Sequence, residues 1–157
     1  MTDLRSTWPP QVDAFFRANP AWIPGIPSHV PLGWDNLVAT ALERLLDLSR
    51  ETGVDIKPAQ IKEKFAGLRL YLNIDEASAG NLEIVEERVS HTHLRSSARP
   101  GSVRAWAQVL VDAAATSSRT TCMTCGRSGQ TVSRAGYLTT ACADHADGGS
   151  PVEDRQA

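Results

Sequence analysis

Residues 61–72 read IKEKFAGLRLYL, and two kinds of side chain alternate on either side of Ala66-Gly67. A mostly apolar set alternates with a polar set: Ile61, Glu63, Phe65, Leu68, Leu70 and Leu72 against Lys62, Lys64, Arg69, Tyr71 and Asn73. A period of two around a glycine predicts two antiparallel strands joined by a tight turn, with a leucine-rich buried face. A competing interpretation extends a helix over residues 58–65, because Ile61 and Phe65 are also four positions apart.

The segments that flank this predicted hairpin have a helical period instead. Residues 34–52 place apolar side chains on one helix face, and Gly53 favours a C-terminal stop. Two further helices are predicted over residues 82–96 and 103–115. From Gly148 onward the chain is polar, and we expect this tail to be disordered.

The polar face of the predicted hairpin gathers four side chains: Lys62, Lys64, Arg69 and Tyr71. One interpretation is a solubilising sheet face, which helps to keep exposed strands from aggregating. The other is a surface that binds an acidic partner protein, because charge complementarity guides association, and arginine and tyrosine are favoured interface anchors. The residues alone leave both interpretations open.

All three cysteines of the chain lie near one histidine, in the runs Cys122-Met-Thr-Cys125 and Cys142-Ala-Asp-His145. Each pair can present two ligands from one tight turn, and two such pairs complete the tetrahedral sphere that zinc prefers. Residues 131–140 between the pairs are typical of a short hairpin. The motif predicts one Zn²⁺ ion in a zinc-ribbon-like unit, and four protein ligands make the site structural. The alternative is three unrelated buried thiols and a surface histidine.

Composition and the remaining motifs favour few other functions. The net charge of −2, from 16 basic and 18 acidic residues, gives no general attraction to nucleic acid or to an anionic membrane. The chain has no P-loop, G-x-G-x-x-G or G-x-S-x-G motif, so we predict no catalytic residues and no enzymatic activity. His91 and His93 would point to different faces of a helix and are expected to be solvated. Clustered cysteines without an even pairing favour a reducing compartment, the cytoplasm.

Two stretches together resemble a family of small, mostly uncharacterised bacterial and phage-borne proteins. IKEKFAGLRLYL is similar to the KEKFG-x-LRFY signature of that family, with Ala66 in place of its usual glycine and Leu70 in place of its usual aromatic residue. Family members typically have a Pro-Gly-Trp start before a long helix, like residues 31–34 here. They end in C-x-x-C-G, a short hairpin and C-x-x-H, like CMTCG and CADH. The resemblance covers about residues 31–72 and 120–146 and implies the fold and the zinc ligands, but no activity.

The sequence therefore predicts an α+β protein with a long N-terminal helix, a β-hairpin, further helices and a C-terminal zinc-ribbon-like unit. The expected boundaries are a body over residues 1–118, a zinc unit over 119–147 and a tail over 148–157. The leading functional hypothesis is a zinc-stabilised, cytoplasmic protein-binding module of the immunity or antitoxin type. The alternative is a nucleic-acid-associated regulator that uses the zinc ribbon, with Arg119, Arg127 and Arg134 as its basic residues.

Overall fold

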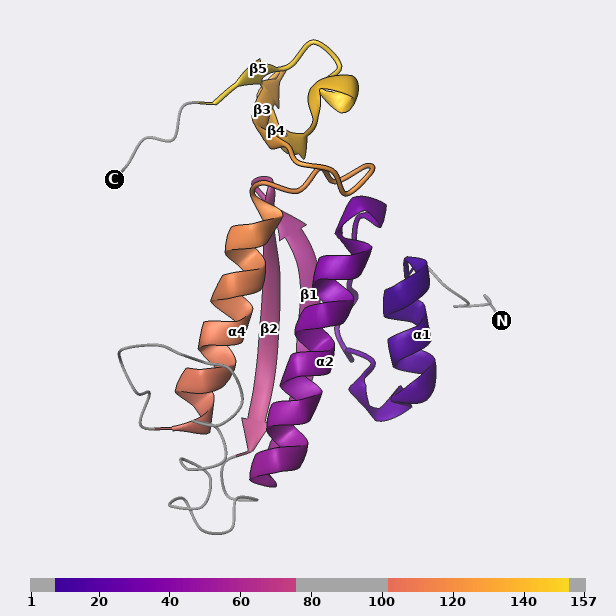
Figure 1. Ribbon diagram of the computed structural model, residues 1–157, viewed down its shortest axis with the longest axis vertical. Helices are drawn as coiled ribbons and strands as arrows, with labels where there is room; N and C mark the ends of the chain where they lie inside the picture. The colour runs from indigo at the N-terminus through magenta and orange to yellow at the C-terminus, as the bar shows by residue number, and fades with distance from the viewer. Residues whose placement is uncertain (1–7, 76–101, 153–157) are drawn as a thin grey trace.

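The computed structural model describes residues 8–75 and 102–152, which form a helix layer packed on a β-hairpin, with a small sheet at one end (Figure 1). The helix layer contains α1 (Pro10–Ala18), α2 (Asp35–Thr52) and α4 (Val103–Ser118), and the hairpin contains β1 (Asp55–Lys64) and β2 (Gly67–Asp75). The small sheet has the order β4-β3-β5 and contains β3 (Gln130–Arg134), β4 (Tyr137–Ala141) and β5 (Ser150–Pro151). Three 3₁₀ turns complete the fold: η1 (Pro20–Trp22), η2 (Leu32–Trp34) and η4 (Ala143–His145). The predicted mixture of helix and sheet is confirmed.

Helix α2 covers the segment for which the sequence predicts a helix, and its C-terminal end has a physical cause. At its end Gly53 has φ 72°, a left-handed conformation that glycine adopts without steric cost. At its start the Asp35 carboxylate accepts hydrogen bonds from the backbone N–H groups of Gln11 and Val12, at 3.0 and 2.9 Å. These are donors of the first turn of α1 that no carbonyl within that helix can satisfy. Asp35 therefore fixes α1 beside α2.

The hairpin has the predicted antiparallel pairing, with Ile61 opposite Leu70 and Lys62 opposite Arg69. The alternative of a helix over residues 58–65 is wrong, because residues 58–64 belong to β1. The turn consists of two residues, Phe65 and Ala66, with φ values of 52° and 63°. Positive φ at both central residues is what a type I′ turn requires, and this turn matches the twist of the flanking strands.

The two turn residues have opposite environments. Ala66 is 1% exposed. Phe65 is 68% exposed at the tip of the hairpin, so the alternation that groups it with the buried Ile61 misplaces it. Alternation stops where the turn begins, because a residue at positive φ no longer follows the pleat of the strand.

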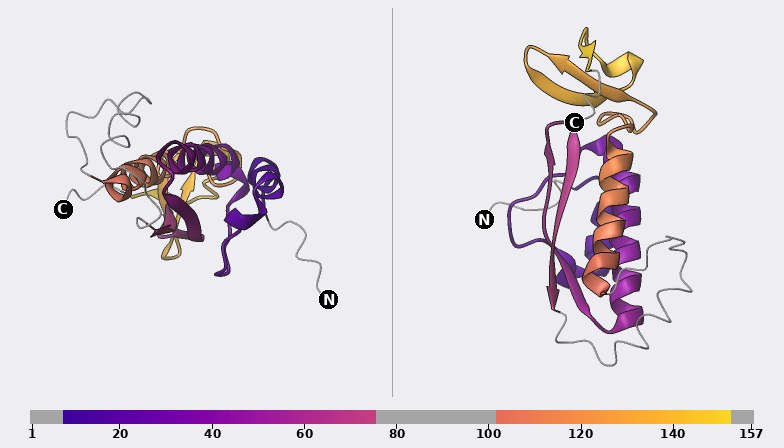
Figure 2. Two further views of the ribbon diagram at one scale, coloured as in Figure 1. Left: turned by 90° about the horizontal axis from the view of Figure 1, so that it is seen from below. Right: turned by 90° about the vertical axis from the view of Figure 1, so that its left-hand side faces the viewer.

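The core lies between the helix layer and the inner face of the hairpin, and Figure 2 shows the two layers from the side and from below. Side chains from all of these elements are fully buried there, among them Val12, Phe16, Trp34, Leu42, Leu45, Ile56, Ile61, Leu68 and Val103. The loop between η1 and η2 then runs along the outer edge of β1. There the Ile61 carbonyl accepts a hydrogen bond from His29 N–H (2.9 Å), and Ile61 N–H donates to Ser28 Oγ (3.0 Å). This edge of the hairpin is therefore paired.

The predictions for two polar segments have different outcomes. The helix predicted over residues 82–96 lies outside the described residues. The prediction of a disordered tail from Gly148 is wrong for residues 150–152: Ser150 and Pro151 pair with β3, and Val152 N–H donates to the Thr131 carbonyl at 3.0 Å. Strand pairing uses backbone groups, so a polar composition does not prevent it.

We expect neighbouring residues of β2 to differ strongly in their effect on stability. Leu70 is 6% exposed in the core, so Leu70→Ala should lower the free energy of unfolding by about 2–5 kcal/mol. Arg69 lies on the opposite face, and Arg69→Ala should change it by less than about 1 kcal/mol. Urea denaturation of both variants would measure the difference, and equal small effects would contradict the packing of β2 against the helices.

Candidate metal centre

Four side chains from two separate turns converge in the small C-terminal sheet. Cys122 and Cys125 lie in the turn between α4 and β3, and Cys142 and His145 lie at the end of β4 and in η4. Their ligand atoms all lie within 4.8 Å of one another, so they can hold one metal ion. We call these four residues the metal cluster. They are the residues that the spacing of the sequence motif singles out.

The individual separations describe a compact set of donor atoms. Cys125 Sγ lies 3.7 Å from Cys142 Sγ, and His145 Nδ1 lies 3.6 Å from Cys122 Sγ and 3.2 Å from Cys142 Sγ. His145 thus turns Nδ1, not Nε2, toward the sulfur atoms. Gly126 follows the first pair with φ 78°, so the chain can reverse there without a Cβ clash.

Arg127, which is not a member of the cluster, donates hydrogen bonds from its guanidinium to two of the sulfur atoms. Its Nε donates to Cys125 Sγ at 3.4 Å, and its Nη2 donates to Cys142 Sγ at 3.8 Å and to Asp144 Oδ2 at 2.7 Å. The hydrogen bond from Arg127 lowers the pKa of the Cys125 thiol. Arg127 is the functional residue that sequence reasoning assigned to a different role, as a basic residue for nucleic acid. Its position two residues after Cys125 is the only signal in the sequence.

The backbone around Cys122 also favours its thiolate. Burial by itself would raise the pKa of Cys122, but hydrogen bonds from the backbone at Cys142, Cys125 and Thr124 outweigh burial and lower this pKa to about 6. The thiolate is the form of cysteine that binds metal ions. The pKa of His145 is raised, because its protonated ring donates hydrogen bonds to the neighbouring sulfurs, Cys122 first. Burial, by contrast, raises the pKa of the third thiol, Cys142, so the cluster is rich in sulfur but favours the thiolate most at Cys122 and Cys125.

The metal unit, residues 119–152, packs on the body through hydrogen bonds to backbone carbonyls and is not merely appended to it (Figure 1). Gly33 N–H donates to the Met123 carbonyl at 2.8 Å, and Trp34 Nε1 donates to the Thr121 carbonyl at 2.9 Å. On the other side, Thr140 Oγ1 donates to the carbonyl of Ala66 in the hairpin turn at 2.8 Å. The metal unit therefore contacts both the start of α2 and the tip of the hairpin.

The four predicted partner-binding residues lie on the outer face of the hairpin, away from the helices. Lys62 and Arg69 are opposite one another in the register, and Lys62 Nζ lies 5.7 Å from the centre of the Tyr71 ring. Lys64 Nζ lies 5.3 Å from the centre of the Phe65 ring. Phe65 thus extends this face at the tip, and we call the five residues the hairpin surface. Sequence alternation missed Phe65 because a turn of two non-glycine residues was not apparent.

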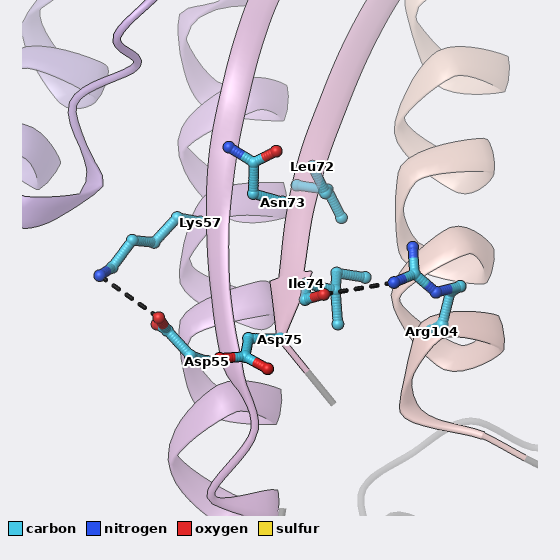
Figure 3. A pocket seen from close by; sticks show the side chains of 7 residues that line it. All are labelled: Asp55, Lys57, Leu72, Asn73, Ile74, Asp75 and Arg104. Carbon is cyan, nitrogen blue, oxygen red and sulfur yellow. Dashed lines mark hydrogen bonds and ion pairs between the residues drawn. The ribbon is translucent and has the colours of Figure 1, made fainter. Parts of the chain in front are cut away.

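An open groove lies at the other end of the hairpin, far from the metal unit (Figure 3). It has a volume of about 340 Å³ and is lined by Asp55, Lys57, Leu72, Asn73, Ile74, Asp75 and Arg104. An ion pair joins Lys57 Nζ to Asp55 Oδ2 at 3.5 Å, and Arg104 Nη2 donates to the Ile74 carbonyl at 3.2 Å. The ion pair lies within β1, and the Arg104 hydrogen bond holds the end of β2 against α4.

The other residues that the sequence singles out are three arginines near the metal unit and two histidines. Arg134 forms an ion pair with Asp147 at 3.7 Å, as Arg127 does with Asp144, and Arg119 lies beside Gly67. His91 and His93 lie outside the described residues. Among the helices in the described part of the chain, none combines the length and apolar character needed to cross a membrane.

Comparisons with known proteins leave the site to be interpreted from its own geometry. No protein-family model matches the chain, and neither a curated protein nor a solved structure is similar to it at a significant level.

Proposed function

We propose that the metal cluster holds one structural Zn²⁺ ion in a zinc-ribbon-like unit, and that this unit stabilises a protein-binding module. The observation that carries the binding proposal is the hairpin surface, where an exposed aromatic side chain sits in a backbone conformation that disfavours it. The metal proposal rests on the donor set and its separations.

Zinc fits the donor atoms in both chemistry and spacing. Zinc accepts thiolate and imidazole ligands in a tetrahedron, with Zn–S of about 2.3 Å and Zn–N of about 2.0–2.1 Å. Such a tetrahedron places sulfur atoms roughly 3.8 Å apart, and sulfur and nitrogen roughly 3.6 Å apart. The separations of 3.7 and 3.6 Å agree with these values, and the 3.2 Å between His145 Nδ1 and Cys142 Sγ is shorter than the tetrahedral value. Four ligands leave no position for substrate, so the ion would supply stability and not catalysis.

Arg127 would balance the charge of the bound ion. Three thiolates and one Zn²⁺ ion leave a net charge of −1, and the Arg127 guanidinium contacts the sulfur atoms of Cys125 and Cys142. Hydrogen bonds to ligating sulfurs orient them and stabilise the bound state. A cytoplasmic location suits these ligands, because a reducing compartment keeps the thiols from forming disulfides.

The hairpin surface supports a protein partner of acidic character. Phe65 is 68% exposed and Tyr71 47% exposed, and one lysine ammonium group lies over each ring. A bulky residue with positive φ costs stability that glycine at the same position would not. Keeping Phe65 there is hard to explain by folding, whereas aromatic and arginine side chains are the usual anchors of interfaces. A binding role for this face explains both observations.

Within this proposal we favour a small immunity or antitoxin-type protein. The ground is general: such proteins are small scaffolds that act through one binding surface and have no catalytic residues. The nucleic-acid alternative has weaker support, because two of its three arginines are paired with Asp144 and Asp147. We propose no enzymatic activity. The resemblance to the bacterial and phage-borne family remains a prediction.

Phe65→Gly is the sharpest test of the binding proposal. Glycine accepts the backbone conformation of the turn, so thermal stability should stay equal or rise. Loss of the aromatic anchor should nevertheless weaken binding to the partner at least about tenfold. The measurement is affinity purification from the source cell, followed by titration of the captured partner with both forms.

The matched controls separate this surface from the general charge of the protein. The variant Lys62→Ala/Arg69→Ala/Tyr71→Ala should also lose the partner, whereas Arg44→Ala/Arg50→Ala, with two exposed cations removed from α2, should retain it. A partner that binds Phe65→Gly and the triple variant as well as the native protein would refute the proposed surface. Micromolar binding to mixed nucleic acids at physiological salt, weakened by Arg127→Ala and Arg134→Ala, would favour the alternative.

A further inference from the structure

The two edges of the hairpin differ in their hydrogen bonding. On β1, the backbone groups of Ile61 point outward and bond to Ser28 and His29 of the adjacent loop. Directly opposite residues of an antiparallel pair either bond to each other or both point outward. Leu70 lies opposite Ile61, so the N–H and C=O groups of Leu70 point away from β1, as do those of every second residue along β2.

Helix α4 closes both ends of this outward edge but not its middle. Near the hairpin turn, Leu68 N–H donates to Ser118 Oγ at 2.9 Å. At the far end, the Ile74 carbonyl accepts the hydrogen bond from Arg104 that Figure 3 shows. Between these points the described residues provide no hydrogen-bond partner for the backbone groups of Leu70 and Leu72.

These backbone groups face a groove between β2 and α4, which lie side by side in Figures 1 and 2. The groove has a volume of about 380 Å³. Leu70 and Val111 give it an apolar floor, and Arg69 and Tyr71 line it on the side of the hairpin surface. Because Leu70 is only 6% exposed, its peptide groups lie in a partly enclosed position, where an unpaired group is costly.

We propose that an extended segment of a partner protein, with alternating acidic and apolar residues, pairs with Leu70 and Leu72 and adds a third strand to the hairpin. The inference rests on the proposed protein-binding function and gives the partner's chemistry. Successive side chains of the added strand point to opposite faces. Those directed toward the helices meet Val111, and those on the other face lie beside Arg69, whose neighbour on β1 is Lys62.

The charges of this surface favour another protein over a second copy of this chain. Two β2 edges paired around a two-fold axis would keep their outer faces on the same side of the joint sheet. Arg69 of one copy would then approach Arg69 of the other, and like charges on neighbouring strands are destabilising. An acidic strand places carboxylates beside Arg69 instead, and the repulsion becomes an attraction.

The test uses the full zinc-loaded chain and a synthetic probe, an N-acetylated peptide amide of alternating glutamate and valine. In ¹⁵N-resolved NMR spectra, millimolar probe should shift the amide signals of Leu70 and Leu72 and slow their hydrogen exchange. Two further probes carry N-methyl groups, one on every valine and the other on every glutamate. Because alternate N–H groups of a strand face opposite edges, one of these probes should bind like the parent and the other at least about tenfold more weakly.

Protein variants test the charge requirement in the same spectra. Arg69→Glu should lower the affinity for the parent probe at least about fivefold. Arg44→Glu, the same charge change on α2, should leave this affinity unchanged. Equal binding of the two N-methylated probes would overturn strand addition, as would unchanged Leu70 and Leu72 signals at millimolar probe. Concentration-dependent shifts of these signals without any probe would overturn it in favour of self-pairing. Any of these results leaves the proposed function standing if Phe65→Gly still loses the natural partner.

Discussion

Replacing Cys125 by serine should remove the metal ion from the protein and destabilise it more than the loss of any single surface contact. A hydroxyl group does not replace a thiolate as a zinc ligand, and structural zinc sites bind with an apparent free energy of about 10–16 kcal/mol in small peptides. The buried residues of the main hydrophobic core all lie outside the metal unit, so we expect loss of the metal to cost only part of this energy and the free energy of unfolding to fall by at least about 3 kcal/mol. That corresponds to a decrease of about 6–12 °C in Tm.

Elemental mass spectrometry and thermal denaturation would measure these effects together. The native protein should contain about one zinc ion per chain, and Cys125→Ser should contain almost none. Thr124→Ser is the matched control, because Thr124 is exposed, adjacent in the same turn and not a member of the metal cluster. Native protein without metal, or Cys125→Ser with the native Tm, would contradict a structural zinc site.

Replacing Gly33 by alanine should separate the metal unit from the body. A Cβ atom at Gly33 would lie 2.0 Å from the carbonyl oxygen of Cys122, 2.6 Å from the carbonyl carbon of Met123 and 2.8 Å from the nitrogen of Gly126. All three atoms belong to the backbone of the metal-binding turn, so no side-chain rotation relieves the contact. We expect a loss of about 3 kcal/mol or more in the free energy of unfolding, at or above the upper range for overpacking.

The control for this variant is Gly25→Ala, because no atom lies within 4 Å of a Cβ built at Gly25. Gly25→Ala should keep the native stability to within about 0.5 kcal/mol. Because the clash involves Cys122 and its neighbours, Gly33→Ala should also release zinc to a chelator faster than the native protein does. Identical unfolding curves for the two variants would show that η2 does not contact the metal-binding turn as described.

The metal cluster and the hairpin were accessible from the sequence because both have local signatures. Two C-x-x-[C/H] pairs specify ligands within single turns, and a period of two specifies strand faces whatever the rest of the chain does. The contact of Gly33 with the metal-binding turn has no such signature, since the two segments are far apart in the chain. Phe65 was misplaced for a different reason. Sequence rules expect glycine or asparagine where φ is positive, and this turn uses neither.

Arg127 and the strand β5 show what a list of residue types leaves out. An arginine near a metal motif is equally compatible with a phosphate contact and with a hydrogen bond to sulfur, and only the Cys125 and Cys142 distances distinguish them. The segment around Ser150 is mostly polar, so composition predicts disorder, yet Ser150 and Pro151 pair with the edge of β3.

The contacts between the metal unit and the body also determine the order in which the chain can fold. The indole of Trp34 donates its hydrogen bond to the carbonyl of Thr121, 87 residues later in the chain. The carbonyl of Ala66 accepts its hydrogen bond from Thr140, 74 residues later. Contacts between such distant residues form slowly, because the loop between them must close first. On the ribosome the hairpin turn therefore emerges long before the residues that hold it. If the metal cluster holds the zinc ion that we propose, Cys142 and His145 complete its ligand set only after the rest of the metal unit has been made, so metal capture would come late in the folding of the chain.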